Sequence, residues 1–269
     1  TRLAAAHHLA SGKPYLLQGG AEPWMAPSFL SAPSSYPSRF PHSYSSVPAR
    51  HVSCNTTAAA TALGLALAHI PYQHITSALL TLHRRARDPG EDKPLKSKPM
   101  EFGTHHAEDV IRVLPELEGS LASKADVKPW EHFHAFDIVL TTTFPRLNQE
   151  SERIEQALRA YPRCAYRERP LRPAAGIAYL RAIGDRLAIP DADLLLPVYS
   201  VRREDAHTLA ISGFTPQRSI VAPSCVDWLG IVEGSLSPTF AATNERARWH
   251  GYAIPELKAV LEAELTAPQ

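Results

Sequence analysis

Cysteine is scarce in this sequence, and almost no net charge remains after the acidic and basic residues are balanced. Cys54, Cys164 and Cys225 lie far apart and form no CxxC pair, which argues against a disulfide framework or a cysteine-only zinc site. Lys and Arg total 28 against 27 for Asp and Glu, whereas a dedicated nucleic-acid-binding domain is usually strongly basic. Three free thiols suit a reducing or matrix-like compartment.

Long hydrophobic runs and phosphate-binding loops are also missing. The apolar stretch from Thr56 to Ile70 is shorter than the roughly 18 to 20 residues that a membrane helix needs, so we expect a buried or interfacial helix there. Neither G-x-G-x-x-G nor G-x-x-x-x-G-K-[ST] occurs, which disfavours a dinucleotide or P-loop site. A G-x-S-x-G serine motif is absent as well. The sequence therefore predicts no cofactor and no catalytic residue.

Proline is abundant, with 24 residues, and it predicts short elements and much extended chain because it fixes φ and removes a donor. Residues 1–57 are rich in serine and proline and contain Glu22 as their only acidic residue. This bias is typical of an organelle-targeting or post-targeting segment and, equally, of a linker. Aromatic residues spaced along the segment are predicted to be anchors in pockets of a neighbouring subunit. They are Trp24, Phe29, Tyr36, Phe40 and Tyr44.

Composition divides the chain into three parts: the extended partner-binding segment 1–57, a helical region with a polar connector at 58–129, and a core domain at 130–269. In the second part we expect the apolar helix to end in a basic cluster, because cations complement the C-terminal end of a helix dipole. That cluster comprises His83, Arg84, Arg85 and Arg87.

The third part carries alternating signals for strands and helices. A β-branched, alternating run predicts a strand at 136–144, and Pro197 favours an edge position for another strand at 194–201. Strands between helices predict an α/β or α+β fold, with a small mixed sheet and flanking helices, preceded by the proline-rich extended N-terminal segment and the helical region. Further short strands are expected at 208–211, 219–222 and 229–232, and helices at 106–114, 148–161, 173–187 and from Pro255 onward.

Histidine is frequent enough to suggest metal binding. His132 and His134 flank Phe133 and would share one face of a strand, but no third ligand follows from the sequence. His105 and His106 precede two acidic residues without the H-E-x-x-H spacing, and this run is interpreted as a polar helix start. We therefore predict no metal site.

One basic stretch, from Arg159 to Arg172, is interleaved with tyrosines. Arg163, Arg167 and Arg169 are its candidate contacts for a protein partner, for lipid headgroups or, less favoured, for RNA. Because other acidic residues offset these arginines, a solvated or protein-facing loop is the preferred interpretation.

These features favour a non-catalytic accessory subunit of a large mitochondrial complex, on the matrix side of the inner membrane or peripheral to it. A respiratory-chain complex or ATP synthase would supply the partner subunits. Two alternatives remain open: a mitochondrial ribosomal protein, and an enzyme or degenerate enzyme built on the α/β domain that begins at Trp130.

Overall fold

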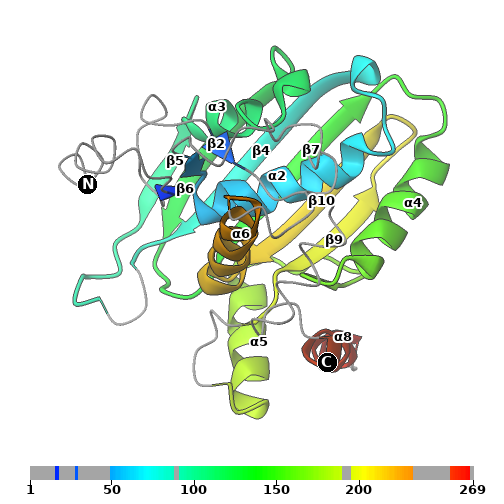
Figure 1. Cartoon of the computed structure of the whole chain (residues 1–269). Helices are drawn as coiled ribbons and strands as arrows, with labels where there is room; N and C mark the ends of the chain where they lie inside the picture. The colour runs from blue at the N-terminus through cyan, green and yellow to red at the C-terminus, as the bar shows by residue number, and fades with distance from the viewer. Residues whose placement is uncertain are drawn as a thin grey trace.

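The computed structural model describes residues 16–17, 28–29, 49–87, 91–189, 195–232 and 255–266. Its main unit is a seven-stranded mixed sheet with the order β5-β6-β4-β7-β10-β9-β8, flanked by helices (Figure 1). The predicted α/β class, with a mixed sheet and flanking helices, is confirmed. The strands are β4 (Ile75–Arg85), β5 (Lys98–Phe102), β6 (Leu121–Lys128), β7 (His134–Thr142), β8 (Ala165–Tyr166), β9 (Val198–Arg203) and β10 (Thr208–Thr215).

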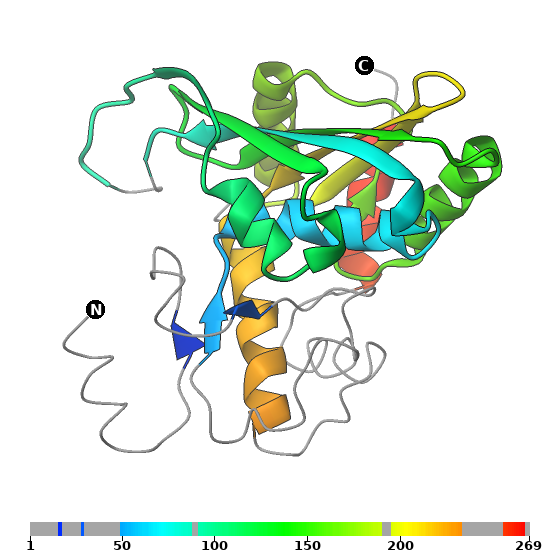
Figure 2. The same ribbon diagram turned by 90° about the horizontal axis from the view of Figure 1, so that it is seen from above.

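Helices cover the sheet unevenly. Figure 2 shows α2, α3 and α6 on one side of the strands. On the other face, α5 packs against β10, where Gly176 of the helix faces the ring of Phe214. The helices are α2 (Cys54–Leu67), α3 (His106–Ile111), α4 (Leu147–Ala160), α5 (Pro173–Arg186), α6 (Gln217–Val232) and α8 (Pro255–Thr266), with 3-10 turns η3 (Tyr72–His74) and η4 (Pro115–Leu117).

Strand β4 is an inner strand that pairs with two strands far from it in the sequence, β6 and β7. It runs parallel to β6, with Ala78 opposite Leu121, and antiparallel to β7, with Leu80 opposite Ile138. Strands β7 and β9 are both antiparallel to β10. The boundary predicted between residues 129 and 130 therefore falls inside one hydrogen-bonded sheet.

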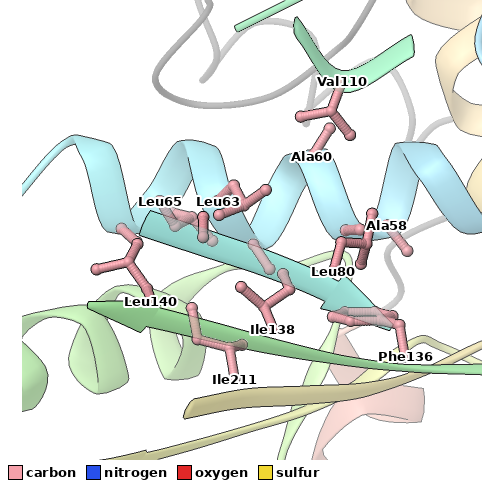
Figure 3. Close-up of a cluster of buried hydrophobic side chains, with 14 of the residues drawn as sticks. Ala58, Ala60, Leu63, Leu65, Leu80, Val110, Phe136, Ile138, Leu140 and Ile211 are labelled. Atoms are coloured by element: carbon pink, nitrogen blue, oxygen red, sulfur yellow. The ribbon is translucent and has the colours of Figure 1, made fainter. Parts of the chain in front are cut away.

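Helix α2 is the most buried helix of this core. Every residue from Asn55 to Ala66 is buried, and most of these side chains are Ala, Thr or Gly. A helix that is apolar on all sides needs cover on all sides, which the sheet, α3, α4 and α6 provide. In Figure 3, Ala58 near the start of the helix lies beside Leu80 and Phe136, and Ala60 faces Val110 of α3.

Several predicted elements are confirmed and three are wrong. Helices α3, α4, α5 and α8 and strands β7 and β10 lie where the sequence indicated them. The basic cluster at 83–87, however, lies at the end of a strand, since His83, Arg84 and Arg85 are the last residues of β4, along which Ala78, Leu80 and Leu82 alternate inward. The segments 219–222 and 229–232 belong to helix α6, since short apolar runs do not distinguish a strand from a buried helix.

Pro197 does not mark a sheet edge. It immediately precedes β9, which pairs with β10 on one side and β8 on the other. Its carbonyl accepts a hydrogen bond from the Ala165 amide at 2.8 Å, so the residue without an N–H still contributes an acceptor.

The N-terminal part contributes a second, three-stranded parallel sheet formed by β1 (Leu16–Leu17), β3 (Ala49–His51) and β2 (Ser28–Phe29). Phe29 lies in β2, and the other four aromatic residues predicted as anchors lie outside the described residues. Their contact with a partner stays a prediction. Among the helices that the structure describes, none combines the length and hydrophobicity needed to cross a membrane.

Candidate functional site

The start of helix α2 presents a cysteine. Ser53 is the N-cap residue, its carbonyl accepts the Thr57 amide at 2.8 Å, and Cys54 is the first residue of the helix. Cys54 is half-buried and forms no disulfide. The positive end of a helix dipole stabilises an anionic sulfur at this position, which is the form that acts as a nucleophile.

A hydrogen-bonded chain connects this helix start to α3. The Asn55 side-chain oxygen accepts the Thr56 amide at 3.0 Å and the Ser53 hydroxyl at 2.6 Å. The Ser53 and Thr56 hydroxyl oxygens are 2.7 Å apart, and the Thr56 hydroxyl oxygen lies 3.1 Å from Nδ1 of His106.

Counting protons along these hydrogen bonds assigns the tautomer of His106. The Thr56 amide identifies the Asn55 atom as oxygen, so Ser53 must use its single proton there. Thr56 then donates to the Ser53 oxygen, because no other proton is available for that contact. Having no second proton, Thr56 accepts from Nδ1–H of His106. Nε2 of His106 therefore carries an unprotonated lone pair.

His106 is held neutral. Burial, followed by the neighbouring charges of His105 and Arg84, lowers its pKa from 6.5 to about 3. The side chain is 2% exposed, and Nε2 is buried without a hydrogen-bond partner. An unsatisfied buried acceptor costs about 1–3 kcal/mol, so this nitrogen is an unusual feature of the structure.

A polar pocket of about 210 Å³ borders His106. Arg84 and Lys98 place positive charge on its wall, and Glu101 and Asp126 place negative charge there. A pocket with this lining suits a small, charged and polar ligand rather than an apolar one. Its remaining lining residues are Pro99, Gly103, Thr104, His105, Ala125 and Val127.

His132 and His134 do not share one face of a strand. Strand β7 begins at His134, and Phe133 between the two histidines has a φ of 57°, which is rare for a bulky residue. Nδ1 of His134 accepts the Arg85 amide at 3.2 Å, so its proton is on Nε2. Burial, with Arg85 and Arg84 nearby, lowers the pKa of His134 well below 6.5.

The other cysteines differ sharply from Cys54 in their environment. Cys164 is fully buried, its thiol donates to the Leu158 carbonyl at 3.3 Å, and burial raises its pKa to about 12. A thiol with that pKa is almost entirely protonated at neutral pH. Cys225 is half-buried inside α6.

The three candidate arginines of the basic stretch occupy different environments. Arg163 is buried, whereas Arg169 is exposed. Arg167 donates to the Leu265 carbonyl of α8 at 3.3 Å and lies over the ring of Tyr179. The structure does not gather these side chains into one surface, and their contact with a partner stays a prediction.

The fold and this site define a class of protein: an α/β domain with a cysteine at the N-terminus of a helix. The same helix is hydrogen-bonded through Thr56 to His106, which lines a polar pocket that also carries cations. Sequence reasoning missed it because it began the helix at Thr56. The available signal was the order Ser53-Cys54, a good N-cap residue followed by cysteine at the first position, ahead of a long apolar run.

Comparison with known proteins points to an enzyme. The chain is 30% identical over 133 residues to a glyceraldehyde-3-phosphate dehydrogenase of Methanococcus maripaludis strain C7, covering 48% of this chain and 37% of that protein. It is 33% identical over 99 residues to the protein of the same name from M. maripaludis strain C6, covering 35% and 28%. The corresponding protein of Methanocaldococcus jannaschii is 33% identical over 96 residues, covering 34% and 27%.

These similarities are partial, since the chain spans between 27% and 37% of the length of these three relatives. No family model matches the chain. The relatives nevertheless overturn two predictions. The main interpretation as a non-catalytic mitochondrial accessory subunit is wrong, as is the prediction of no enzymatic activity, and the enzyme alternative fits better. The predicted location and partner subunits stay predictions.

Proposed function

We propose that this protein is a cysteine-dependent enzyme that acts on phosphorylated aldehydes, with Cys54 as the nucleophile. The observation that carries the proposal is the position of Cys54 at the start of α2, in a chain similar to glyceraldehyde-3-phosphate dehydrogenases. Thiolates are the usual nucleophiles where a protein attacks a carbonyl carbon through sulfur.

The first chemical step requires only groups of this chain and the substrate. The sulfur of Cys54 attacks the aldehyde carbon, a carbon–sulfur bond forms, and the π bond of the carbonyl opens. The carbonyl oxygen takes up the proton that the thiol has lost, which gives a hemithioacetal. Charge develops on that oxygen during attack, and the positive end of the α2 dipole stabilises it.

The neighbouring pocket supports a phosphorylated substrate. Arg84 and Lys98 on its wall are the cations that a phosphate group needs, and the Thr56–His106 hydrogen bond fixes that wall against the helix that bears Cys54. His106 contributes no proton here, because its Nε2 is the unprotonated nitrogen. The phosphate contacts are therefore assigned to Arg84 and Lys98.

Oxidation of the hemithioacetal needs a hydride acceptor, and a nicotinamide dinucleotide is the usual acceptor in dehydrogenases. The described residues do not fit such a group: no glycine-rich turn connects a parallel strand to a helix among them. We therefore assign to these residues the thiol addition and the binding of the phosphorylated aldehyde, and derive no hydride step.

The direct test is covalent labelling of Cys54 by an acyl donor. Purified protein is mixed with p-nitrophenyl acetate at pH 7.5, released nitrophenol is followed, and the acylated residue is located by peptide mass spectrometry. We expect a burst of one equivalent with the acetyl group on Cys54. Oxidation of glyceraldehyde-3-phosphate with NAD⁺ or NADP⁺ and phosphate is measured on the same preparation.

Two variants separate the nucleophile from a general thiol effect. Cys54→Ser should lower the burst and any turnover by about three orders of magnitude or more, as loss of a nucleophile does in other enzymes. Cys225→Ser, which changes another half-buried cysteine, should leave both unchanged. Acylation spread over several cysteines, or retained in Cys54→Ser, would refute the proposal.

A further inference from the structure

Three potential metal ligands meet at the start of α3. One ring nitrogen each of His105 and His106 and one carboxylate oxygen of Asp109 lie within 4.8 Å of one another, the only such group among the described residues. His105 and Asp109 are four residues apart, which places them on one face of the helix, and their Nε2 and Oδ2 atoms are 4.0 Å apart. The His105 side chain is 65% exposed, whereas His106 and Asp109 are buried.

The buried, unsatisfied Nε2 atom of His106 indicates what kind of ligand fits at this cluster. Its lone pair on Nε2 is buried and lacks a partner, and the atom is closed to water-sized molecules. A substrate hydroxyl group is no smaller than water and is excluded by the same contacts. A dehydrated metal ion is smaller and sits about 2.0–2.1 Å from an imidazole nitrogen, so it reaches an atom that water does not.

We propose that His105, His106 and Asp109 form a binding site for a divalent transition-metal ion such as Zn²⁺, with a coordination position open to the neighbouring pocket. Two imidazoles and one carboxylate are a common three-ligand set for zinc sites that retain an exchangeable position. The Thr56 hydroxyl oxygen accepts the Nδ1–H of His106 and so fixes the ring, as metal-binding histidines usually donate their other ring N–H to a fixed acceptor.

Access and charge are compatible with this occupant. His105 borders the 210 Å³ pocket, so an ion enters from solvent beside an exposed side chain that rotates to close the site. Arg84 and Lys98 oppose a cation there, while Glu101 and Asp126 on the same wall and Asp109 at the site favour it.

The site is tested by direct metal binding in the Cys54→Ser protein, which removes the competing thiolate and makes the result independent of catalysis. The protein is freed of metal with a chelator and titrated with Co²⁺, whose visible absorption reports a site with nitrogen and oxygen ligands, and with Zn²⁺ by calorimetry. We expect one equivalent of either ion, with Zn²⁺ displacing Co²⁺.

Variants assign the ligands. His105→Ala changes an exposed side chain and should weaken binding at least about tenfold, as should Asp109→Asn. Thr56→Val, which removes the hydroxyl that accepts the Nδ1–H of His106, should weaken binding by about 10- to 100-fold, and Thr56→Ser should restore it. His74→Ala at the opposite end of β4 is the matched control and should bind normally.

The outcomes are distinguishable. Absence of Co²⁺ absorption and of a calorimetric signal in folded protein would overturn the proposal, as would binding that His105→Ala and Asp109→Asn leave intact. Folding of each variant is checked by circular dichroism. Binding lost in these variants and kept in His74→Ala would establish the site, whether or not Cys54 is a nucleophile.

Discussion

At the scale of single residues, His134 of β7 is a buried histidine that the folded protein keeps neutral. His134 is buried and receives the Arg85 amide on Nδ1, so a second proton would place a charge in the core beside two arginines. The unfolded chain has no such restriction. This difference makes His134 a source of acid sensitivity.

We expect the free energy of unfolding to decrease as the pH falls below about 6.5, because the unfolded state then binds a proton at His134 that the native state excludes. One such proton corresponds to a slope of up to about 1.4 kcal/mol per pH unit. His134→Asn retains an acceptor for the Arg85 amide and should reduce this slope, as measured by urea unfolding at several pH values. His207→Asn, in the exposed turn before β10, should keep the native slope.

Residue identity alone revealed part of this site. The sequence shows His105, His106 and Cys54, but the unprotonated Nε2 of His106 depends on four hydrogen-bonding groups from two elements about 50 residues apart. The H-E-x-x-H pattern does not describe this cluster, because Asp109 follows His105 by one helical turn, whereas His106 directly follows His105. Such mixed spacings have no simple sequence pattern.

At the scale of elements, α8 is attached to the sheet edge by buried polar contacts. Nζ of Lys258 donates to the carbonyl groups of Tyr161 at 2.9 Å and Cys164 at 2.7 Å, next to the C-terminal end of α4. The Glu262 carboxylate accepts the Tyr166 amide at 2.9 Å, which ties α8 to β8. Lys258 therefore donates to carbonyl groups in the turn that follows α4.

We expect Lys258→Met to lower the free energy of unfolding by about 1–3 kcal/mol, since it removes a donor from the carbonyl groups of Tyr161 and Cys164. Hydrogen exchange should rise across 255–266 and at the end of α4, and urea unfolding gives the total loss. Arg186→Met removes the surface ion pair between Arg186 of α5 and Glu264 of α8, and it should lower the free energy of unfolding by only about 0–1 kcal/mol. Equal losses in the two variants would contradict this role of Lys258.

The elements that the sequence predicted well are those with a clear amphipathic period or cap. In α4, Ile154 and Leu158 recur on one face, and Pro173 opens α5 at the position where a proline is tolerated. The sequence did not predict strand β4 and helix α6, because each depends on contacts with neighbouring elements of the fold. Burial between β6 and β7 makes residues 75–85 a strand, and contact with α2 accommodates α6 despite Pro223.

At the scale of the whole molecule, hydrogen-bonded side chains cross the outer face of the sheet. His83 of β4 lies 2.9 Å from Asp126 of β6 and 3.7 Å from Asp137 of β7. The Ser212 hydroxyl of β10 donates to Asp137 at 2.6 Å. Four adjacent strands are thereby connected by polar groups on one face, while α2 packs on the other.

This arrangement predicts that residues 130–269 do not fold independently. The fragment lacks β4, α2 and β6, so the buried face of β7 would be open to water and one edge of β7 unpaired. We expect no cooperative urea transition for it, measured by fluorescence and circular dichroism, against one transition for residues 1–269. A cooperative transition of the fragment alone would support the domain boundary predicted at residue 130.

The central position of β4 also sets an order of events during synthesis. The ribosome releases α2 and β4 well before β7, because Leu80 pairs with Ile138, which lies 58 positions later in the chain. Until β7 emerges, an apolar helix and an open strand share the exit region without their covering layer. Helix α2, which is buried in the folded protein, is therefore exposed in the nascent chain until β7 has emerged. Chaperone binding would matter most in that interval.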